Sequence, residues 1–237
     1  MWPKISNSSN TSDQLKKAID WDQWWQEKLS TDQIDRYIRP FVQAPLVEYQ
    51  GELCDIANNT HLLIKIMKEF NLRKILCAGS GVSYEPVALA EAGFDVTALD
   101  ISSTAIRIAN MIAFDPECRI ELGANPAGPS DSLDFVPGDL LDPAVCPGPF
   151  DMIIERRTIQ TFSEQDRPAA LKALAARLGE VGVLLSHCNY GGCSLAPGGK
   201  LFHGSESWFN KENWIIWDGA PGLILKEQVA WLIRTAA

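Results

Sequence analysis

The chain has 237 residues, of which 46% are apolar and 22% are charged, as in an ordinary globular protein. That length suits one α/β domain, alone or with a helical extension. The formal net charge of −9 makes nucleic acid an unlikely partner, because a phosphate backbone repels an acidic chain at long range.

The cysteines and the apolar runs give expectations about metal, membrane and compartment. The six cysteines form no Cys-x-x-Cys pair, so we expect no metal site, and scattered thiols suit a reducing compartment. The first residues lack the apolar core of a signal peptide, and no apolar run approaches the ~20 residues that span a bilayer. We therefore expect a cytoplasmic protein without a membrane partner. The oligomeric state is not indicated.

Residues 1–70 read as a helical extension. Apolar side chains recur at a spacing of three or four, which predicts one apolar helix face: Trp21, Trp24, Trp25 and Leu29. A second helix is expected from about Leu53 to Phe70, and its inward side chains would be Ile56, Leu63, Ile64, Met67 and Phe70. The tryptophans have two open interpretations, either a lid over a ligand or ordinary core packing.

A different pattern begins at residue 74. An apolar run at 74–78 ends in Gly79-Ser80-Gly81 and predicts a strand followed by a tight loop. A helix is expected over 84–92, with Gly93 as its stop. A second strand over 95–99 ends at Asp100, and Ser102 can cap a helix from 103 to about 112. This order is a βαβ unit followed by its next helix.

The remaining elements are less regular. Residues 115–133 are expected to be a long loop, with a short strand near Ile120 at most. Further strands are expected at 135–136, 150–155 and 181–187. A helix should start at Ser163 or Asp166 and run to Leu178, with Pro168 in its first turn. The segments 212–218 and 226–234 could form a helix and strands, or an antiparallel pair.

This alternation predicts a parallel sheet with helices on both faces. Ligands of such folds bind beyond the carboxyl ends of the strands. We therefore expect five segments to converge on one crevice: Gly79–Ser83, Asp100, Asp139, Glu155–Arg157 and His187–Gly192.

The glycine loop and the acids indicate an adenosine-containing cofactor. Glycines let a ligand approach the backbone closely, and Asp100, 21 positions after Gly79, could accept hydrogen bonds from ribose hydroxyls. Tyr84 stands where a dinucleotide fingerprint needs its third glycine, and this disfavours a nicotinamide cofactor. Asp139 follows the third strand and is a further acid expected at the same edge.

Residues 74–187 resemble the class I S-adenosylmethionine-dependent methyltransferase family in four motifs: 75–81, the strand ending at Asp100, the segment around Asp139, and 150–155. The resemblance implies an α/β fold, a three-layer doubly wound mostly parallel sheet with an N-terminal helical extension. It implies a division into an extension or lid at 1–70 and a cofactor-binding domain at 71–237. It also implies cofactor contacts for the methionine (Gly79, Ser80, Gly81), the ribose (Asp100) and the adenine (Ile101, Asp139, Leu140).

A narrower resemblance is to the thiopurine methyltransferase-like branch. It is carried by Trp21-Asp22, Leu99-Asp100-Ile101-Ser102 and Glu155-Arg156. Two positions depart from that branch, since Ala78 replaces a proline and Arg157 replaces a glycine. Ser83 and Cys77 also depart from the wider family's glycine loop and could reshape the methionine end of the site.

The resemblance implies methyl transfer to a small-molecule acceptor. Candidates for a catalytic side chain are Glu155, His187 and Tyr190; Glu155 could equally contact the cofactor or pair with Arg156. Two other functions stay open. One is a non-catalytic protein that binds S-adenosylmethionine, which the altered glycine loop allows. The other is a nicotinamide-dependent oxidoreductase, which the lack of a Tyr-x-x-x-Lys pair disfavours.

Overall fold

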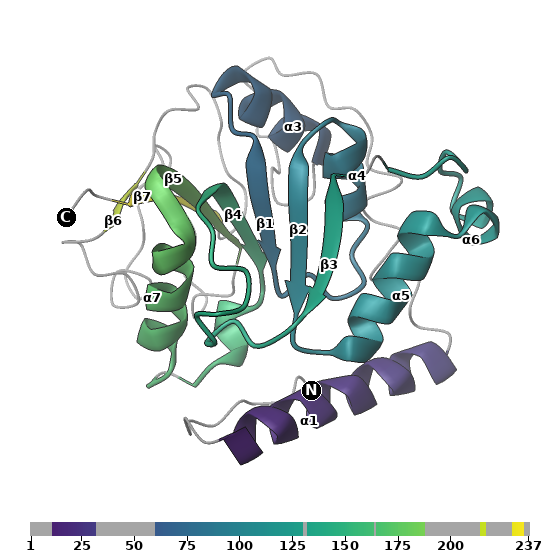
Figure 1. Cartoon of the computed structure of the whole chain (residues 1–237), viewed down its shortest axis with the longest axis horizontal. Coiled ribbons are helices and arrows are strands. Elements are labelled where there is room, and N and C mark those ends of the chain that lie inside the picture. Colours follow the sequence, from purple (N-terminus) through teal and green to yellow (C-terminus); the bar gives the residue numbers. More distant parts are fainter. Residues whose placement is uncertain are drawn as a thin grey trace.

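The structure is a computed structural model that describes residues 11–31, 60–129, 132–163, 165–187, 214–216 and 229–234. Figure 1 shows a central sheet with helices packed around it and a long N-terminal helix lying across one end. Among the described helices, none combines the length and the apolar character that a membrane span requires.

The sheet has seven strands in the order β3-β2-β1-β4-β5-β7-β6. Their bounds are β1 Lys74–Ala78, β2 Asp95–Asp100, β3 Leu133–Pro137, β4 Phe150–Arg156, β5 Leu178–His187, β6 Trp214–Ile216 and β7 Val229–Arg234. Strands β1 to β5 are parallel to one another, whereas β7 is antiparallel to both β5 and β6. The mostly parallel sheet is confirmed, and of the two alternatives left open for the tail the structure has the antiparallel pair.

The described helices are α1 Thr11–Ser30, α3 Thr60–Glu69, α4 Glu85–Glu91, α5 Ser103–Phe114, α6 Pro116–Glu121, the 3-10 helix η2 Ile159–Thr161, and α7 Arg167–Arg177. Ser102 caps α5 as expected, because its hydroxyl accepts a hydrogen bond from the Ala105 N–H. Gly93 follows α4 with a φ of +93°, the left-handed conformation typical of a helix stop. Local sequence signals therefore place these helices correctly.

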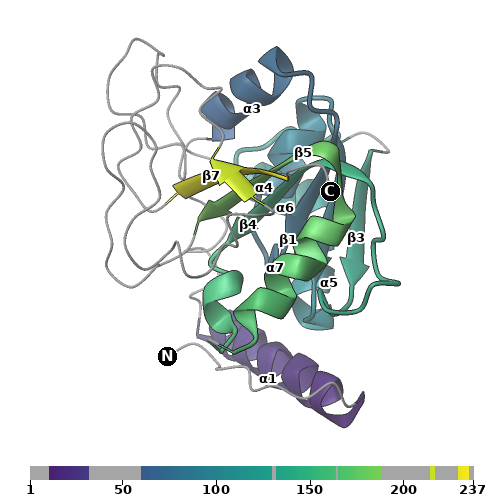
Figure 2. The same ribbon diagram turned by 90° about the vertical axis from the view of Figure 1, so that its left-hand side faces the viewer.

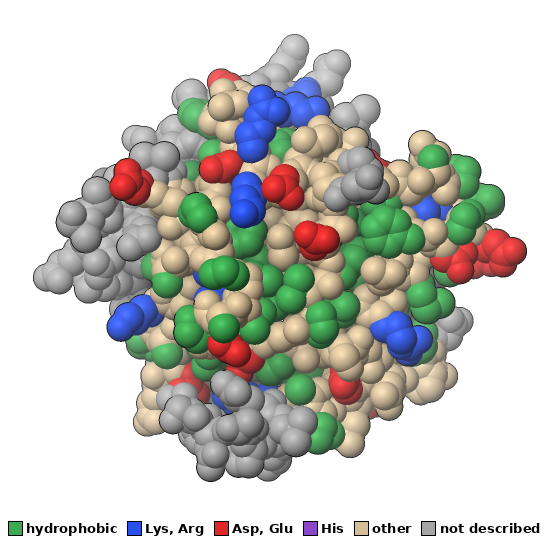
Figure 3. Space-filling view, in the orientation of Figure 1, with side chains coloured by type: hydrophobic (Ala, Val, Ile, Leu, Met, Phe, Trp, Pro, Cys, Tyr) green, Lys and Arg blue, Asp and Glu red, His purple; other side chains and the backbone are tan. Residues whose placement is uncertain are grey.

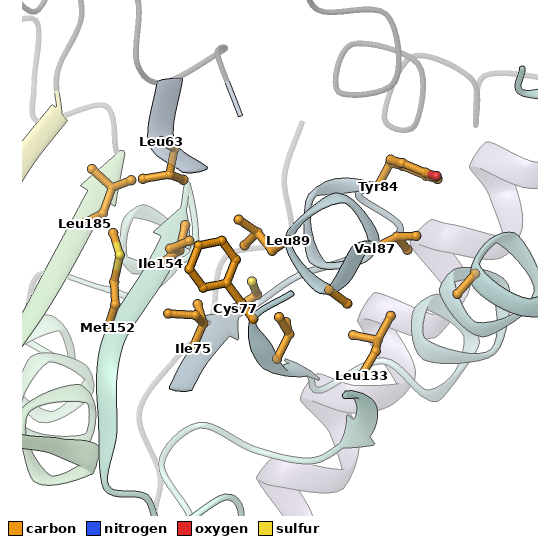
Figure 4. Close-up of a cluster of buried hydrophobic side chains, with 14 of the residues drawn as sticks. Leu63, Ile75, Cys77, Tyr84, Val87, Leu89, Leu133, Met152, Ile154 and Leu185 are labelled. Atoms are coloured by element: carbon orange, nitrogen blue, oxygen red, sulfur yellow. The ribbon is translucent and has the colours of Figure 1, made fainter. Parts of the chain in front are cut away.

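Both faces of the sheet are buried, and the alternation along β1 explains how. Ile75 and Cys77 point into a cluster with side chains of α3, α4 and α5, which Figure 4 shows in close-up. Leu76 and Ala78 point to the other face and pack in a cluster with α7 and η2. Successive strand residues face opposite sides of a sheet, so a strand covered on both faces is apolar throughout. Helices on both faces of the sheet therefore give a three-layer arrangement.

The prediction for residues 115–133 is wrong in part, since α6 occupies 116–121. Its start is encoded locally: Asp115 caps the first turn through the N–H groups of Glu117 and Cys118, and Pro116 stands at the first position. Its end is held by tertiary contacts, because the fully buried Arg119 pairs with Glu91 of α4. A short helix that depends on a buried arginine has little apolar periodicity to reveal it.

Two side chains expected to face inward are exposed. Leu29 is 46% exposed near the end of α1, and Phe70 is 36% exposed just beyond α3. Leu29 lies in the last turn of α1, and Phe70 follows the last residue of α3. Trp21, Trp25, Leu63 and Met67 are buried as expected, whereas Ile56 lies outside the described residues. Strand β5 also begins earlier than expected, directly after α7 ends.

Candidate functional site

The carboxyl ends of the parallel strands bring the predicted site residues to one edge of the sheet. Ala78, the last residue of β1, pairs with Leu99 of β2 and with Glu155 of β4. The arrowheads of β1, β2 and β3 in Figure 1 point toward α1, which lies across this edge; Figure 2 shows the same position of α1 after a quarter turn. The cofactor motifs therefore meet beneath α1.

The glycine loop is shaped by its neighbours. The N–H groups of Gly79 and Ser80 both donate to the Leu99 carbonyl, at 2.7 and 3.0 Å, and this folds the loop back over β2. Gly79 and Gly81 have φ values of +66° and +55°. A β-carbon at Gly79 would lie 2.1 Å from Oγ1 of Thr158, so a side chain is excluded there by sterics as well as by backbone conformation.

The third position of the loop, Ser83, has a structural role here. Its hydroxyl accepts a hydrogen bond from the Glu85 N–H at 3.1 Å, at the beginning of α4. Hydroxyl side chains commonly satisfy such unpaired amides at helix starts. The departure from the family pattern therefore supplies a helix-starting contact.

Asp100 lies at the centre of the site. Its carboxylate is 9% exposed and accepts hydrogen bonds from the N–H of Gly81 at 2.8 Å and of Ser102 at 2.9 Å. Burial raises the pKa of Asp100 to about 6; the two backbone hydrogen bonds oppose this rise, and the charge of Asp22 adds to it. Each carboxylate oxygen keeps a further lone pair, so ribose hydroxyls can still be accepted.

Two buried polar atoms at this edge have no hydrogen-bond partner among the described residues: Ser80 Oγ and Asp139 Oδ2. The other oxygen of Asp139 accepts from the Leu141 N–H at 2.8 Å, which fixes the carboxylate. An unpaired buried polar atom costs free energy, so both atoms suit the donors of a bound ligand. The donor set of adenosine, two ribose hydroxyls and one amino group, fits the acceptors of Asp100 and Asp139.

The two apolar residues predicted near adenine differ in position. Ile101 follows Asp100 at the end of β2 and is partly buried, as a contact with a ligand would require. Leu140 is 6% exposed, and its side chain packs into the cluster beneath α7. Any contact of Leu140 with adenine would therefore be through its backbone.

The carboxylate of Glu155 is hydrogen-bonded to the backbone of the segment that follows β4. It is fully buried, and one carboxylate oxygen accepts from the N–H groups of Thr158 and Ile159 at 3.1 and 3.2 Å. The Ser186 hydroxyl donates to its other oxygen. These contacts fix the turn that brings Thr158 against Gly79. The geometry thus gives Glu155 a structural role and adds no support to its predicted catalytic or cofactor-binding role.

Arg156 lies on the opposite face of β4 from Glu155, since successive strand residues alternate. Its guanidinium pairs with the Glu85 carboxylate at the start of α4, with Nε donating to Oε2 at 2.7 Å. Arg156 therefore forms an ion pair with Glu85 of α4, whereas the sequence had suggested its neighbour Glu155 as the partner.

His187 ends β5 at the same edge, where its backbone pairs with Arg156 on one side and Val229 on the other. The side chain of His187 and the whole of Tyr190 lie outside the described residues. Their catalytic roles stay predictions.

Three further residues contact this site, and the sequence had given none of them a definite role there. Asp22 of α1 accepts hydrogen bonds from the Ser102 hydroxyl at 2.5 Å and the Thr104 N–H at 2.9 Å. Trp25 of α1 faces Gly81, where a β-carbon would lie 2.8 Å from the indole. Thr158 lies against Gly79. The Trp21-Asp22 resemblance was a signal for Asp22, and the apolar helix face, with its open interpretation as a lid, was a signal for Trp25. No local signal marks Thr158.

Burial alone would raise the pKa of the Asp22 carboxyl. The hydrogen bonds from Ser102, Thr104 and Ser103 outweigh burial and lower its pKa. Asp22 is therefore ionised at neutral pH, at the N-terminal end of α5, where a negative charge is favoured by the helix dipole.

Comparisons with known proteins support the assignment of the fold. Residues 76–186 match the family model described as a methyltransferase domain. The magnesium protoporphyrin IX methyltransferase of Synechocystis PCC 6803, solved with bound SAM, is 15% identical over 97% of this chain and 100% of that chain, with a TM-score of 0.56. A TehB-like SAM-dependent methyltransferase from Corynebacterium glutamicum is 17% identical over 93% of this chain and 98% of that chain, with a TM-score of 0.48.

A search of curated proteins found no match. At 15% identity and a TM-score of 0.56, the first structure shows a shared fold and nothing finer, and the fold is argued from that structure alone. The strand order 3-2-1-4-5 of the parallel part, the glycine loop beside Asp100 and the match over 76–186 agree with one another. Residues 76–186 therefore match a methyltransferase domain, for which the cofactor is S-adenosylmethionine.

Proposed function

We propose that this enzyme transfers a methyl group from S-adenosylmethionine to a small-molecule acceptor at the carboxyl edge of the sheet. The observation that carries the proposal is that two acidic acceptors are available at this edge. Asp100 is buried and is held by two backbone N–H groups, and Oδ2 of Asp139 is buried without a hydrogen-bond partner among the described residues. Together they offer acceptors for the hydroxyl and amino groups of adenosine.

Each residue has a task in this proposal. Asp100 accepts the ribose hydroxyls, Asp139 accepts the adenine amino group, and Gly79, Ser80 and Gly81 line the methionine. When bound, the cofactor supplies a methyl group on a positively charged sulfur, which is already activated for displacement. The protein has mainly to align the acceptor and exclude water.

A small acceptor is favoured by the charge of the molecule and by where its cations lie. The net charge is −9. Arg119, Arg156 and Arg177 are engaged within the fold, with Glu91, with Glu85 and with backbone carbonyls between 142 and 146 respectively. On the face seen in Figure 3, lysines and arginines are scattered among acids and apolar groups. Such a surface does not attract a polyanion.

The acceptor atom decides whether a base is needed. A thiol needs little help, because its pKa lies near neutral, whereas a hydroxyl or an amine needs a positioned base. With Glu155 fully buried, His187 and Tyr190 are the remaining candidates from the sequence. Thiols are therefore the first acceptors to test.

Cofactor binding is tested by isothermal titration with S-adenosylmethionine and, separately, with NADH. We expect wild-type protein to bind the former alone and Asp100→Ala to lose binding while remaining folded by circular dichroism. Asp95→Ala is the matched control, since Asp95 is an exposed acid at the other end of β2. Wild-type affinity in a folded Asp100→Ala protein would refute the ribose role.

The acceptor class is tested with methyl-labelled S-adenosylmethionine and a cell extract separated into a low-mass filtrate and a macromolecular fraction. A labelled low-mass compound other than the cofactor itself should form with wild-type protein and not with Asp100→Ala. Label that enters only the macromolecular fraction would overturn the small-molecule proposal and leave the cofactor assignment intact.

A further inference from the structure

The contacts of α1 join it to the segments on both sides of Asp100. Asp22 binds the segment that follows Asp100, through Ser102, Ser103 and Thr104. Trp25 packs on Gly81, whose N–H donates to Asp100. Helix α1, although distant in sequence, thus contacts both the glycine loop at Gly81 and the segment 102–104 that follows Asp100.

Ser102 connects the two carboxylates directly. Its hydroxyl donates to Asp22 at 2.5 Å, and its N–H donates to Asp100 at 2.9 Å. Asp22 also accepts from the Thr104 N–H, so it caps the first turn of α5 from another element of the chain. Any movement of α1 away from the sheet breaks these hydrogen bonds at the site where the ribose would be held.

The tryptophans seat α1 on the same edge. Trp25 is 5% exposed, and its ring centroid lies 4.7 Å from that of Trp24 in an edge-on arrangement. The unpartnered atoms Ser80 Oγ and Asp139 Oδ2 are buried at this edge too. Because such atoms are buried, a ligand can reach them only after some local movement, and α1 lies across this edge in both ribbon views (Figures 1 and 2).

We propose that α1 is a gate over the cofactor crevice and that Asp22 is the positioning residue that holds it closed. This inference rests on the proposed function, because it assigns the closed site to S-adenosylmethionine. Cofactor enters and leaves while α1 is undocked, and docking returns Trp25 to the glycine loop and Asp22 to α5.

The gate is tested by stopped-flow measurement of S-adenosylmethionine association and dissociation, followed by tryptophan fluorescence. In Asp22→Ala we expect dissociation to be faster by about tenfold, the size expected for losing hydrogen bonds to a charged group. Asp22→Asn should be intermediate, because its amide keeps one acceptor oxygen. Asp20→Ala, an exposed acid two positions earlier on the same helix, should match the wild type.

A second measurement separates gating from a general loss of stability. Hydrogen–deuterium exchange without cofactor should rise in residues 11–30 of Asp22→Ala and stay unchanged in β1 and β4. Unchanged dissociation in Asp22→Ala, with wild-type protein that binds cofactor, would overturn the gate alone. Wild-type protein that binds no cofactor would overturn the proposed function and the gate with it.

Discussion

Replacing Gly79 with alanine tests how the glycine loop is built. The backbone at Gly79 has a φ of +66°, and a β-carbon there would lie 2.1 Å from Oγ1 and 2.6 Å from Cγ2 of Thr158. The left-handed conformation costs a non-glycine residue roughly 1–2 kcal/mol. Overlap with packed atoms adds roughly 1–3 kcal/mol. We expect Gly79→Ala to lower the free energy of unfolding by roughly 2–5 kcal/mol, a large part of the stability of a typical domain.

Gly123 provides the matched control. It has a similar φ of +74°, but a β-carbon there would meet nothing within 4 Å. Gly123→Ala should therefore cost only the conformational part, roughly 1–2 kcal/mol. The difference between the two variants measures the collision with Thr158.

The assay is urea unfolding of both variants, and of Gly79→Ala combined with Thr158→Ala. Removing the hydroxyl and methyl of Thr158 leaves only its β-carbon near the new side chain, at 2.9 Å, so part of the penalty should be relieved. The reasoning is refuted if Gly79→Ala costs no more than Gly123→Ala, or if the two substitutions at 79 and 158 are simply additive.

Two further predictions concern the acids of the site. Because the pKa of Asp100 is raised to about 6, cofactor affinity measured by titration calorimetry should weaken roughly tenfold per pH unit below that value; a constant affinity from pH 7.5 to 5 would argue against an ionised Asp100 as the ribose acceptor. In the free protein the same shift has the opposite consequence: since the folded pKa exceeds the unfolded value of 3.8, the contribution of Asp100 to stability is greatest below pH 4 and declines as pH rises toward 6. Glu155→Gln should lower the free energy of unfolding by about 1–3 kcal/mol, because its new amide cannot accept all the hydrogen bonds from Thr158, Ile159 and Ser186. A drop in kcat at unchanged unfolding midpoint would instead favour the catalytic role.

The sequence determined most elements of the α/β domain, because their signals are local. Strand β1 is a five-residue apolar run, Ser102 is a helix cap, and Gly93 is a helix stop. The acid at the end of β2 and the glycine loop after β1 converge in any parallel sheet of this order, so Asp100 and Gly79 could be placed at one edge without a structure.

Local signals were insufficient where an element depends on distant contacts. Helix α6 is held by Arg119 against Glu91, and periodicity gave no sign of it. Leu29 continues the helical repeat of the buried Trp21 and Trp25 and is nevertheless 46% exposed, because a repeat predicts a helix face but not how much of that face is covered.

Only the tertiary structure shows which groups the Glu155 carboxylate contacts and which distant residues surround the site. Glu155 could be read from sequence as a base, a cofactor contact or an ion-pair partner, and only its burial among the amides of η2 shows where its oxygens are used. Asp22 and Ser102 lie 80 positions apart in the chain, and Thr158 and Ala78 lie 80 apart as well. Periodicity and capping act over a few residues. The contacts that surround the crevice form only when the packed helices and strands bring such distant residues together.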